Sequence, residues 1–385
     1  MKLIFAHDHI FKLTTNGDFY SPGKLNNQSF SRYLSLFSSV TIVSRAENTS
    51  DKQAEQYNKI DDKNINFIAF DNQSNLVNRF IKRPYYKRKL KKIISHYDAV
   101  VVRLPSEIGF LCAEVALSLN IPYVCEVVAC PKDAMKGFNS LKGMLYSPII
   151  VSSMRTYVKK AAGALYVTDS FLQKRYPCLG FSRKASNVEI SEVNKLKKSY
   201  NIEEKTHIKI VLTGHLDSVH KGYDTAYAAA KFINASLINR KIEFIFIGPG
   251  IKFKKVLNLQ NVSFNFTGAL KPSEVIKCLD NADIYIQPSN QEGLPRATIE
   301  AMSRRLPCIV SNAGGLPELI DKRFVHNVND HTRLANKIID LISNNALYQE
   351  QSDLNALKSE RFISNQLTSI RNSFFSQYQK LLLTD

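Results

Sequence analysis

Short apolar runs recur along the chain, and most are followed by a polar or glycine-containing turn and then by a segment of helical composition. Apolar runs of this length, bounded by turn residues, are typical of buried β-strands. Strands that alternate with helices form parallel sheets, whose ligands gather at the carboxyl ends of the strands. The pattern therefore predicts an α/β protein with doubly wound sheets. The expected strands lie at residues 2–6, 40–43, 65–70, 99–102, 121–128, 164–167, 208–212, 244–247, 262–266, 284–287 and 308–310.

The chain is 385 residues long, which is more than one hydrophobic core usually holds, so we expect two domains. A turn-rich segment at 176–190 leads into a polar, lysine-containing stretch at 191–205, and the strand pattern restarts after it. We therefore place a domain boundary near residue 190. Helices are expected between the strands and over most of the final segment, at residues 30–37, 75–96, 140–162 and 328–384.

The composition is that of a globular protein, with 44% hydrophobic and 22% charged residues. No apolar run approaches the ~20 residues of a membrane span, and residues 2–6 are expected to be a first strand and not a signal peptide or anchor. The six cysteines show no C-x-x-C spacing, which predicts reduced core residues of a cytosolic protein and not a zinc site. A net charge of +18 predicts an anionic partner, with nucleic acid and an anionic membrane as the two candidates.

The segment at 282–320 carries the most informative chemistry. After the strand at 284–287, the turn P-S-N ends the strand and a helix follows, with Pro295 in its first turn. Glu292 lies in this loop, Glu300 lies in the helix, and a Gly-Gly pair follows the next strand and is expected to open another helix. Helix N-termini and exposed N–H groups favour phosphate, and carboxylates accept hydrogen bonds from sugar hydroxyls. The segment therefore predicts a site for a nucleotide sugar.

The strings S-N-Q-E-G-L-P-R-A-T-I-E-A-M and S-N-A-G-G-L-P-E-L-I closely resemble the retaining glycosyltransferases of family four, whose hallmark is Glu, seven residues, Glu. The resemblance implies the GT-B architecture, in which two Rossmann-like domains face each other across a cleft, with a donor domain at 191–365 and a closing helix at 366–385 that packs on an acceptor domain at 1–190. It also implies that Glu292 contacts the donor sugar and that Glu300 holds the ribose. Three further residues are expected near the diphosphate or sugar: Gly293, Leu294 and Gly315.

The match also has departures. Such proteins usually carry glycine where Arg305 stands, so we expect a different cap at this helix end. A second family string, Gly-Arg-Leu followed by Lys-Gly, matches at Gly214 and at Lys221, which is expected to neutralise the leaving diphosphate, but His215 replaces the arginine. The loop at Gly268 to Leu270 is expected to present backbone groups to the base.

The acceptor side of the site is less well marked. The first loop, expected at 7–25, contains His7 and His9, and the family often has glycines there near the donor phosphate. Many family members also place a histidine at the end of the strand at 121–128, but this chain has none there. The candidates for acceptor-side roles are His9, Gly17, Gly23, Arg103, Ser106, Glu126 and Asp133, each of which has a structural alternative as a cap, turn or ion-pair residue.

The resemblance predicts a retaining glycosyltransferase with a nucleotide-diphosphate sugar as donor substrate, no separate cofactor and a saccharide acceptor. No Asp-x-Asp is present, so we expect a reaction without metal. A sugar-nucleotide epimerase can share the architecture and remains an alternative. A basic nucleic-acid-binding protein is a second alternative, although the sequence shows no helix-turn-helix or aromatic-basic platform for single strands.

The excess charge is concentrated in two stretches. No acidic residue lies between Asp71 and Asp98 or in 134–168, where lysines and arginines stand beside tyrosines and aliphatic residues. This mixture is typical of a surface that binds anionic lipid, although a solvated basic face shows the same composition. It predicts a peripheral enzyme on the inner face of the cytoplasmic membrane that extends a lipid-linked saccharide.

Overall fold

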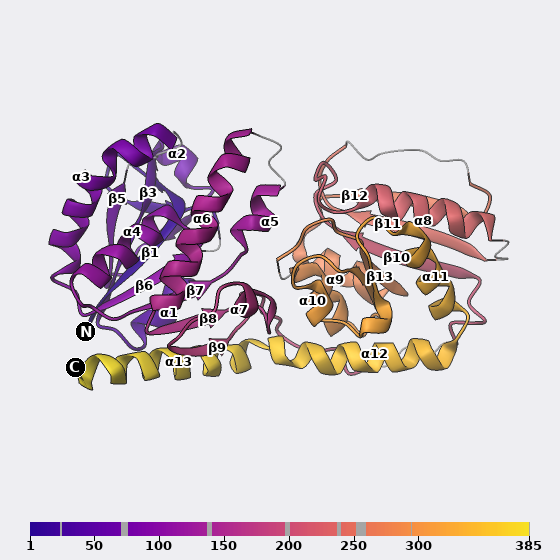
Figure 1. Ribbon diagram of the computed structural model, residues 1–385. Helices are drawn as coiled ribbons and strands as arrows, with labels where there is room; N and C mark the ends of the chain where they lie inside the picture. Colours follow the sequence, from indigo (N-terminus) through magenta and orange to yellow (C-terminus); the bar gives the residue numbers. More distant parts are fainter. Residues whose placement is uncertain are drawn as a thin grey trace. The chain divides into compact units, whose positions relative to one another are not determined.

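The computed structural model describes residues 1–23, 25–70, 76–136, 141–196, 201–236, 240–251, 259–293 and 295–384, and for 76–81, 134–136 and 141–145 it describes the backbone alone. These residues form two compact units (Figure 1). The first consists of Met1–Ala185 and Thr368–Asp385, and the second of Ser186–Leu367. The boundary lies a few residues before residue 190, and the end of the chain belongs to the first unit.

The first unit is built on a nine-stranded sheet. Its strands are β1 (Lys2–Leu13), β2 (Phe19–Ser21), β3 (Ser39–Asn48), β4 (Asn58–Ile60), β5 (Ile65–Phe70), β6 (Ala99–Leu104), β7 (Tyr123–Val127), β8 (Gly163–Tyr166) and β9 (Phe181–Lys184). On one side of β1 the parallel order runs through β6, β7, β8 and β9, and on the other side through β3 and β5. The order therefore reverses at β1, as in a doubly wound sheet.

The first strand is longer than expected, because residues 7–13 continue β1 and do not form a loop. A bulge that contains His7 and His9 interrupts the register with β3. The Ser44 hydroxyl of β3 lies 2.7 Å from the carbonyl oxygen of His7 and 2.6 Å from that of His9, so it satisfies the backbone inside the bulge. Beyond it, β1 and β2 form an antiparallel hairpin that pairs with β4. The expectation of a polar loop over 7–25 is therefore wrong for most of that range.

Helices cover both faces of this sheet (Figure 1). Alternate residues of β1 point to opposite faces. Ile4 and Ala6 share a core with α3, α4 and α6, whereas Phe5 packs against Phe30 and Tyr33 of α1. The helices that belong wholly or mostly to this unit are α1 (Asn27–Leu34), α2 (Asp51–Ala54), α3 (Leu76–Ile94), α4 (Glu107–Ser118), α5 (Pro131–Lys136), α6 (Leu141–Lys160), α7 (Phe171–Arg175) and α13 (Ser364–Thr384).

The last helix, α13, completes the core of the first unit, although it lies at the opposite end of the sequence. Tyr378 on α13 is fully buried. Its hydroxyl donates to the carbonyl oxygen of Pro122 at 2.7 Å and accepts from the N–H of Val100 at 2.9 Å. Both partners belong to the first unit, so the helix is tied to the sheet by hydrogen bonds as well as by packing.

The second unit has a six-stranded parallel sheet in the order β12, β11, β10, β13, β14, β15. The strand order reverses between β10 and β13, so the loops that follow these two strands lie at a topological switch point. Its strands are β10 (His207–Thr213), β11 (Lys241–Ile247), β12 (Val262–Gly268), β13 (Ile284–Gln287), β14 (Cys308–Ser311) and β15 (Val325–His326). Its helices are α8 (Tyr223–Ala235), α9 (Pro272–Asp280), α10 (Arg296–Ser303), α11 (His331–Ile342) and α12 (Asn345–Ser359).

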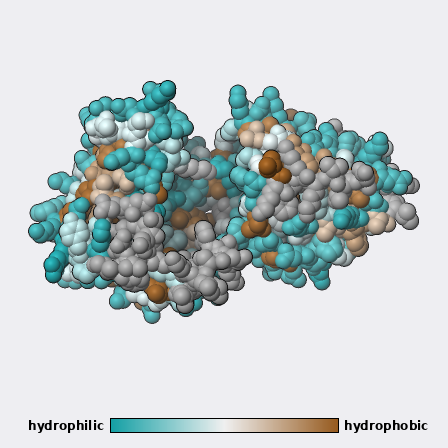
Figure 2. All heavy atoms as spheres, turned by 90° about the horizontal axis from the view of Figure 1, so that it is seen from above, coloured by the Kyte–Doolittle hydropathy of each residue, from teal (hydrophilic) through white to brown (hydrophobic). Residues whose placement is uncertain are grey.

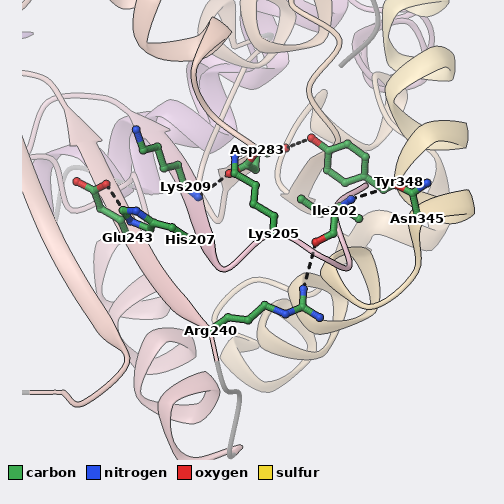
Figure 3. A network of polar contacts seen from close by, with 9 residues as sticks. All are labelled: Ile202, Lys205, His207, Lys209, Arg240, Glu243, Asp283, Asn345 and Tyr348. Atoms are coloured by element: carbon green, nitrogen blue, oxygen red, sulfur yellow. Dashed lines mark hydrogen bonds and ion pairs between the residues drawn. The ribbon is translucent and has the colours of Figure 1, made fainter. Parts of the chain in front are cut away.

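A polar network holds the amino ends of β10 and β13 together (Figure 3). The carboxylate of Asp283 is fully buried, accepts from Lys205 Nζ at 2.6 Å and accepts from the backbone N–H of Lys209 at 2.8 Å. The hydroxyl of Tyr348 on α12 donates to the carbonyl oxygen of Asp283 at 2.9 Å. A buried charge is tolerated only when it is paired and hydrogen-bonded, as here. This network fixes the two strands whose opposite ends carry the candidate site.

The end of α10 corrects one sequence expectation. Arg305 has φ 62°, and its N–H donates to Met302 O while the N–H of Leu306 donates to Ala301 O. These two bonds form an ordinary Schellman motif, with arginine at the position that glycine usually occupies. The expected different cap is therefore wrong. The side chain of Arg305 is only 12% exposed and pairs with Asp353.

The Gly-Gly pair at 314–315 does not open a full α-helix as expected. One turn of 3-10 helix, η1 (Leu316–Glu318), follows it, and a second turn, η2 (Lys322–Phe324), precedes β15. A third such turn, η3 (Glu360–Phe362), lies between α12 and α13.

The surface and the cysteines complete the description. Hydrophilic residues dominate the face seen in Figure 2, where apolar residues form small separate patches. All six cysteines are free, and four of them are buried. None of the described helices is both long and apolar enough to cross a membrane.

Candidate active site

The central contact of the candidate site joins the loops that follow β10 and β13, at the switch point of the second sheet. The ammonium group of Lys221 donates a hydrogen bond to Oε1 of Glu292. The two side chains are 24% and 14% exposed, so the pair is accessible from solvent but largely enclosed. The sequence prediction placed both residues at the donor, and the structure brings them into direct contact.

Three loops interlock around this pair. Gly222 has φ 72°, and a Cβ added there would lie 1.8 Å from the carbonyl oxygen of Pro288. Gly314 has φ 57°, and a Cβ there would lie 1.6 Å from the carbonyl oxygen of Glu292. Both positions need glycine for the conformation and for the close approach. The N–H of Gly315 donates to Gly293 O at 3.0 Å, so it is used within the protein and holds the loops together.

A chain of buried polar side chains supports these loops from below. The hydroxyl of Tyr285 donates to Oε1 of Gln287 at 2.5 Å, and Nε2 of Gln287 donates to Oγ of Ser289 at 2.7 Å. Ser311 Oγ donates to the carbonyl oxygen of Ser289 at 2.5 Å. Burial raises the pKa of Tyr285 well above its ordinary value, so the hydroxyl stays a hydrogen-bond donor. From the sequence, 287–289 were expected only to end a strand, and the polar residues Gln287 and Ser289 after three apolar ones were the available signal.

Glu300 and Arg296 lie on the same side of α10, one helical turn apart. The distance from Arg296 Nη1 to Glu300 Oε1 is 3.7 Å, and the two side chains are 39% and 24% exposed. The Nε atom of Arg296 is buried, and it has no hydrogen-bond partner among the described residues. Arg296 was not singled out from the sequence, although it stands inside the family string.

The other donor candidates are more loosely arranged. The aliphatic stem of Lys221 passes over Gly214, whose added Cβ would lie 3.0 Å from it. His215 is 57% exposed, and its Nδ1 accepts from the N–H of Asp217 at 3.3 Å. In the loop after β12, Gly268 O accepts from the N–H of Gly248, and Leu270 is partly buried against the core. Leu294 lies outside the described residues.

In the first unit, two acceptor-side candidates form an ion pair. Arg103 Nη1 lies 3.3 Å from Oε2 of Glu126, and the hydroxyl of Tyr33 donates to Oε1 of Glu126 at 2.6 Å. Burial alone would raise the pKa of Glu126, but Arg103, Arg32 and the Tyr33 hydroxyl hold it below its ordinary value. A charged carboxylate therefore lies beneath the carboxyl ends of β6 and β7. Tyr33 was not expected from the sequence.

The histidines of the β1 bulge lie at the same edge of this sheet. The Nδ1 atom of His7 lies 3.1 Å from the carbonyl oxygen of Arg103, and Nε2 of His9 lies 3.0 Å from Oγ of Ser21. Burial, together with the nearby Arg103, lowers the pKa of each histidine to about 4. Both rings are therefore neutral at pH 7. Gly23 packs against the His9 ring, where an added Cβ would lie 3.1 Å away.

The remaining candidates have structural roles. Ser106 caps α4 by accepting from the N–H of Gly109 at 2.9 Å. The carboxylate of Asp8 accepts from the first two N–H groups of α4, those of Glu107 at 2.6 Å and Ile108 at 3.1 Å, so protein side chains already occupy this helix N-terminus. Asp133 pairs with Arg175 at 2.6 Å. Gly17 has φ 84° in the β1–β2 turn, away from the bulge histidines in the register of the hairpin.

Comparison with known proteins places the chain in a family. Residues 193–357 match the family described as "Glycosyl transferases group 1". Over 94% of its length the chain is 31% identical to Protein CapJ of Staphylococcus aureus, of which the match covers 91%. The chain belongs to the group 1 glycosyltransferases.

Two further likenesses extend this result. One relative is the UDP-Gal:alpha-D-GlcNAc-diphosphoundecaprenol alpha-1,3-galactosyltransferase of Escherichia coli. This glycosyltransferase is 27% identical to it over 31% of its own length and 33% of the relative's. Its structure resembles HepE of Anabaena in complex with UDP, with a TM-score of 0.63, 14% sequence identity and 99% and 100% of the two chains covered. At this identity the likeness establishes the fold, and the glycosyltransferase has the GT-B fold expected from the sequence.

The site of this glycosyltransferase contains one accessible ammonium, two carboxylates and one loosely held guanidinium at the strand ends of its second unit. Among the described residues, no group of three or more His, Cys, Asp or Glu side chains converges as metal ligands would. The arrangement can accept hydrogen bonds from sugar and ribose hydroxyls and can neutralise phosphate charge.

Proposed function

We propose that this glycosyltransferase moves a sugar from a nucleoside-diphosphate donor to a saccharide acceptor with retention of configuration, in the biosynthesis of a cell-surface polysaccharide. The observation that carries the proposal is the Lys221–Glu292 contact at the switch point, with Glu300 on the adjacent helix. CapJ and the Escherichia coli galactosyltransferase, whose acceptor is diphosphoundecaprenol-linked, support the polysaccharide context. UDP bound to the structurally similar HepE supports the class of donor.

The donor side is assigned as follows. Lys221 binds the diphosphate and neutralises the charge that grows on it as the glycosidic bond breaks. Glu292 accepts hydrogen bonds from hydroxyls of the donor sugar, and Glu300 accepts them from the ribose. Gly293 and the N-terminus of α10 allow close approach of the phosphates, whereas Gly315 holds the loops in place. No side chain is assigned as a nucleophile.

The contact between Lys221 and Glu292 gives donor binding an order of events. In the structure the ammonium and the carboxylate neutralise each other. A diphosphate that takes the Lys221 ammonium frees the Glu292 carboxylate for the sugar hydroxyls. Binding of the two parts of the donor is therefore coupled through this pair.

For the acceptor we propose the edge of the first sheet where the β1 bulge lies beside the carboxyl ends of β6 and β7. Arg103 is held there by a charged Glu126, and the neutral rings of His7 and His9 lie beside it. Neutral imidazoles both donate and accept hydrogen bonds, as recognition of sugar hydroxyls requires. The side chains of Ser106 and Asp133 have partners within the protein and act here as supports.

We further propose that the acceptor is lipid-linked and that the enzyme works at the inner face of the cytoplasmic membrane. Helices α3 and α6 both pack against α4, so the two basic stretches lie in one helix layer of the first unit. Arg83 and Lys87 pair with Glu114, but the basic residues after Lys87 on α3 and those of the second half of α6 are exposed, as are Tyr85 and Ile149. Each lysine or arginine near an anionic surface contributes about 1 kcal/mol. The exposed basic residues are Arg88, Lys89, Lys91, Lys92, Arg155, Lys159 and Lys160.

A screen of nucleotide sugars tests the activity. Purified enzyme is incubated with each donor, without and with saccharide and lipid-diphosphate acceptors, and release of the nucleoside diphosphate is measured. The proposal requires release with at least one donor and faster release with the right acceptor. Conversion of the donor to another nucleotide sugar without any release would instead support an epimerase. Equal rates with and without EDTA are expected, because no step is assigned to a metal.

A further inference from the structure

The guanidinium of Arg296 is held less firmly than those of Arg304 and Arg323, two other arginines of the second unit. Arg304 bonds to Asp280 at 2.6 Å, and Arg323 bonds to Glu350 at 2.6 Å. Among the described residues, the acidic side chain that Arg296 approaches is Glu300, at 3.7 Å, which is too long for a hydrogen bond. Its Nε is buried with no partner among the described residues. An unsatisfied buried donor on a charged group costs free energy, and a ligand that binds the guanidinium would offset that cost.

A nucleoside diphosphate needs more positive charge than the rest of the site supplies. Lys221 is one cation, and part of its charge is offset by Glu292. His215 is mostly exposed and is near Asp217, and a histidine is only a partial cation at neutral pH. Arg296 is permanently charged, and its planar fork of donors matches the oxygens of a phosphate.

The position of Arg296 decides which phosphate it reaches. It lies one turn before Glu300 on the same side of α10, next to the carboxylate assigned to the ribose. Of the two phosphates, the one that is bonded to the ribose therefore lies closer to Arg296. Lys221, which contacts the carboxylate assigned to the donor sugar, is nearer to the distal phosphate.

We propose that Arg296 is the second cation of the donor site and binds the ribose-linked phosphate of the nucleotide, in the role that an arginine at position 215 would otherwise have. The inference rests on the proposed function, because it assumes that the nucleotide binds at Glu300. It assigns the two phosphates to two different side chains, Arg296 and Lys221.

Calorimetric titration with UDP, UMP and uridine tests the assignment on the full chain, after a first screen of UDP, GDP, ADP and CDP. Arg296→Gln should lower the affinity for UDP and UMP by about tenfold to a hundredfold, the range for a hydrogen bond to a charged group, and leave the affinity for uridine unchanged. Arg296→Lys should lose less affinity than Arg296→Gln. Lys221→Ala should lower the affinity for UDP more than that for UMP.

Arg333→Gln is the matched control. Arg333 lies in the first turn of α11 with a similarly loose approach to Asp330, at 3.6 Å, but it is 70% exposed and belongs to a different helix. Its replacement should leave all three affinities unchanged. Unchanged UDP affinity in a folded Arg296→Gln variant, or an equal loss for uridine, would overturn this inference and leave the donor site standing. A wild-type chain that binds none of the four nucleoside diphosphates would overturn the donor site itself.

Discussion

Replacing Tyr33 by phenylalanine removes one hydrogen bond from a buried, charged carboxylate and changes little else. The Tyr33 hydroxyl lies 2.6 Å from Oε1 of Glu126 inside the first unit, and both residues are buried. A hydrogen bond to a charged group contributes about 1.5 to 3 kcal/mol. We therefore expect Tyr33→Phe to lower the free energy of unfolding of this unit by about 2 kcal/mol at pH 7.

The loss of unfolding free energy in Tyr33→Phe should depend on pH. The folded-state pKa of Glu126 lies below its ordinary value, so its contribution to stability is present above that value and is lost as pH falls through the folded pKa. Without the Tyr33 hydroxyl, one cause of the lowered pKa is gone and this contribution is smaller. The gap between wild type and variant should therefore be full at pH 7 and should narrow below about pH 4.

Tyr123→Phe provides a matched control. The Tyr123 hydroxyl is also in the first unit and donates at 2.6 Å, but to a neutral acceptor, the carbonyl oxygen of Tyr157. Its loss should cost about 1 kcal/mol and should not change with pH in the acid range. Unfolding is measured by urea titration with hydrogen-exchange mass spectrometry as the readout. Peptides of β6 and β7 then report the unfolding of the first unit separately from that of the second. Equal losses for the two variants, or a Tyr33→Phe loss that stays constant down to pH 3, would refute a charged Glu126.

Further predictions concern the donor site, the α10 cap and the membrane. Glu300→Ala should weaken UDP binding by about 1.5 to 3 kcal/mol in a folded protein, measured by calorimetry, and unchanged affinity would remove Glu300 from the site. Lys221→Ala should lower kcat by well over twofold, measured as release of the nucleoside diphosphate. Arg305→Val should lower the melting temperature more than Arg305→Gly, because a β-branched residue tolerates φ 62° poorly. The protein should sediment with anionic liposomes but not with neutral ones, and salt should reverse the binding. Glutamate at four exposed positions of α3 should abolish it: Arg88, Lys89, Lys91 and Lys92.

The alternation of strands and helices could be read from the sequence, because each buried strand is a short apolar run between turn residues. The strand at 284–287 has the bounds that were expected. The extension of β1 could not be read in the same way. Polar His7, Asp8 and His9 interrupt the apolar pattern, and the strand continues only because Ser44 of the neighbouring strand satisfies the bulge. That contact joins residues far apart in sequence.

The residues of the candidate site likewise fall into those with a local sequence signal and those without one. Lys221 and Glu292 were candidates from the sequence because both stand in recognisable strings at strand ends, and the structure shows that their side chains are in contact. Arg296 stood in the same string, but its significance depends on a missing partner, which only three-dimensional packing reveals. Tyr33 and Glu126 are 93 positions apart, so their hydrogen bond has no local signal at all.

The position of α13 affects how this protein is made. The ribosome releases residues 1–185 long before it synthesises Tyr378, yet Tyr378 is fully buried in the unit that these early residues form. Until then, the backbone N–H of Val100 and the carbonyl oxygen of Pro122 lack their partner, and the surface that Phe374 and Phe375 later cover stays open. We therefore expect the second unit, which is continuous in sequence, to be able to fold before the first is complete. A premature stop codon shortly before Tyr378 would then damage the unit that is translated first.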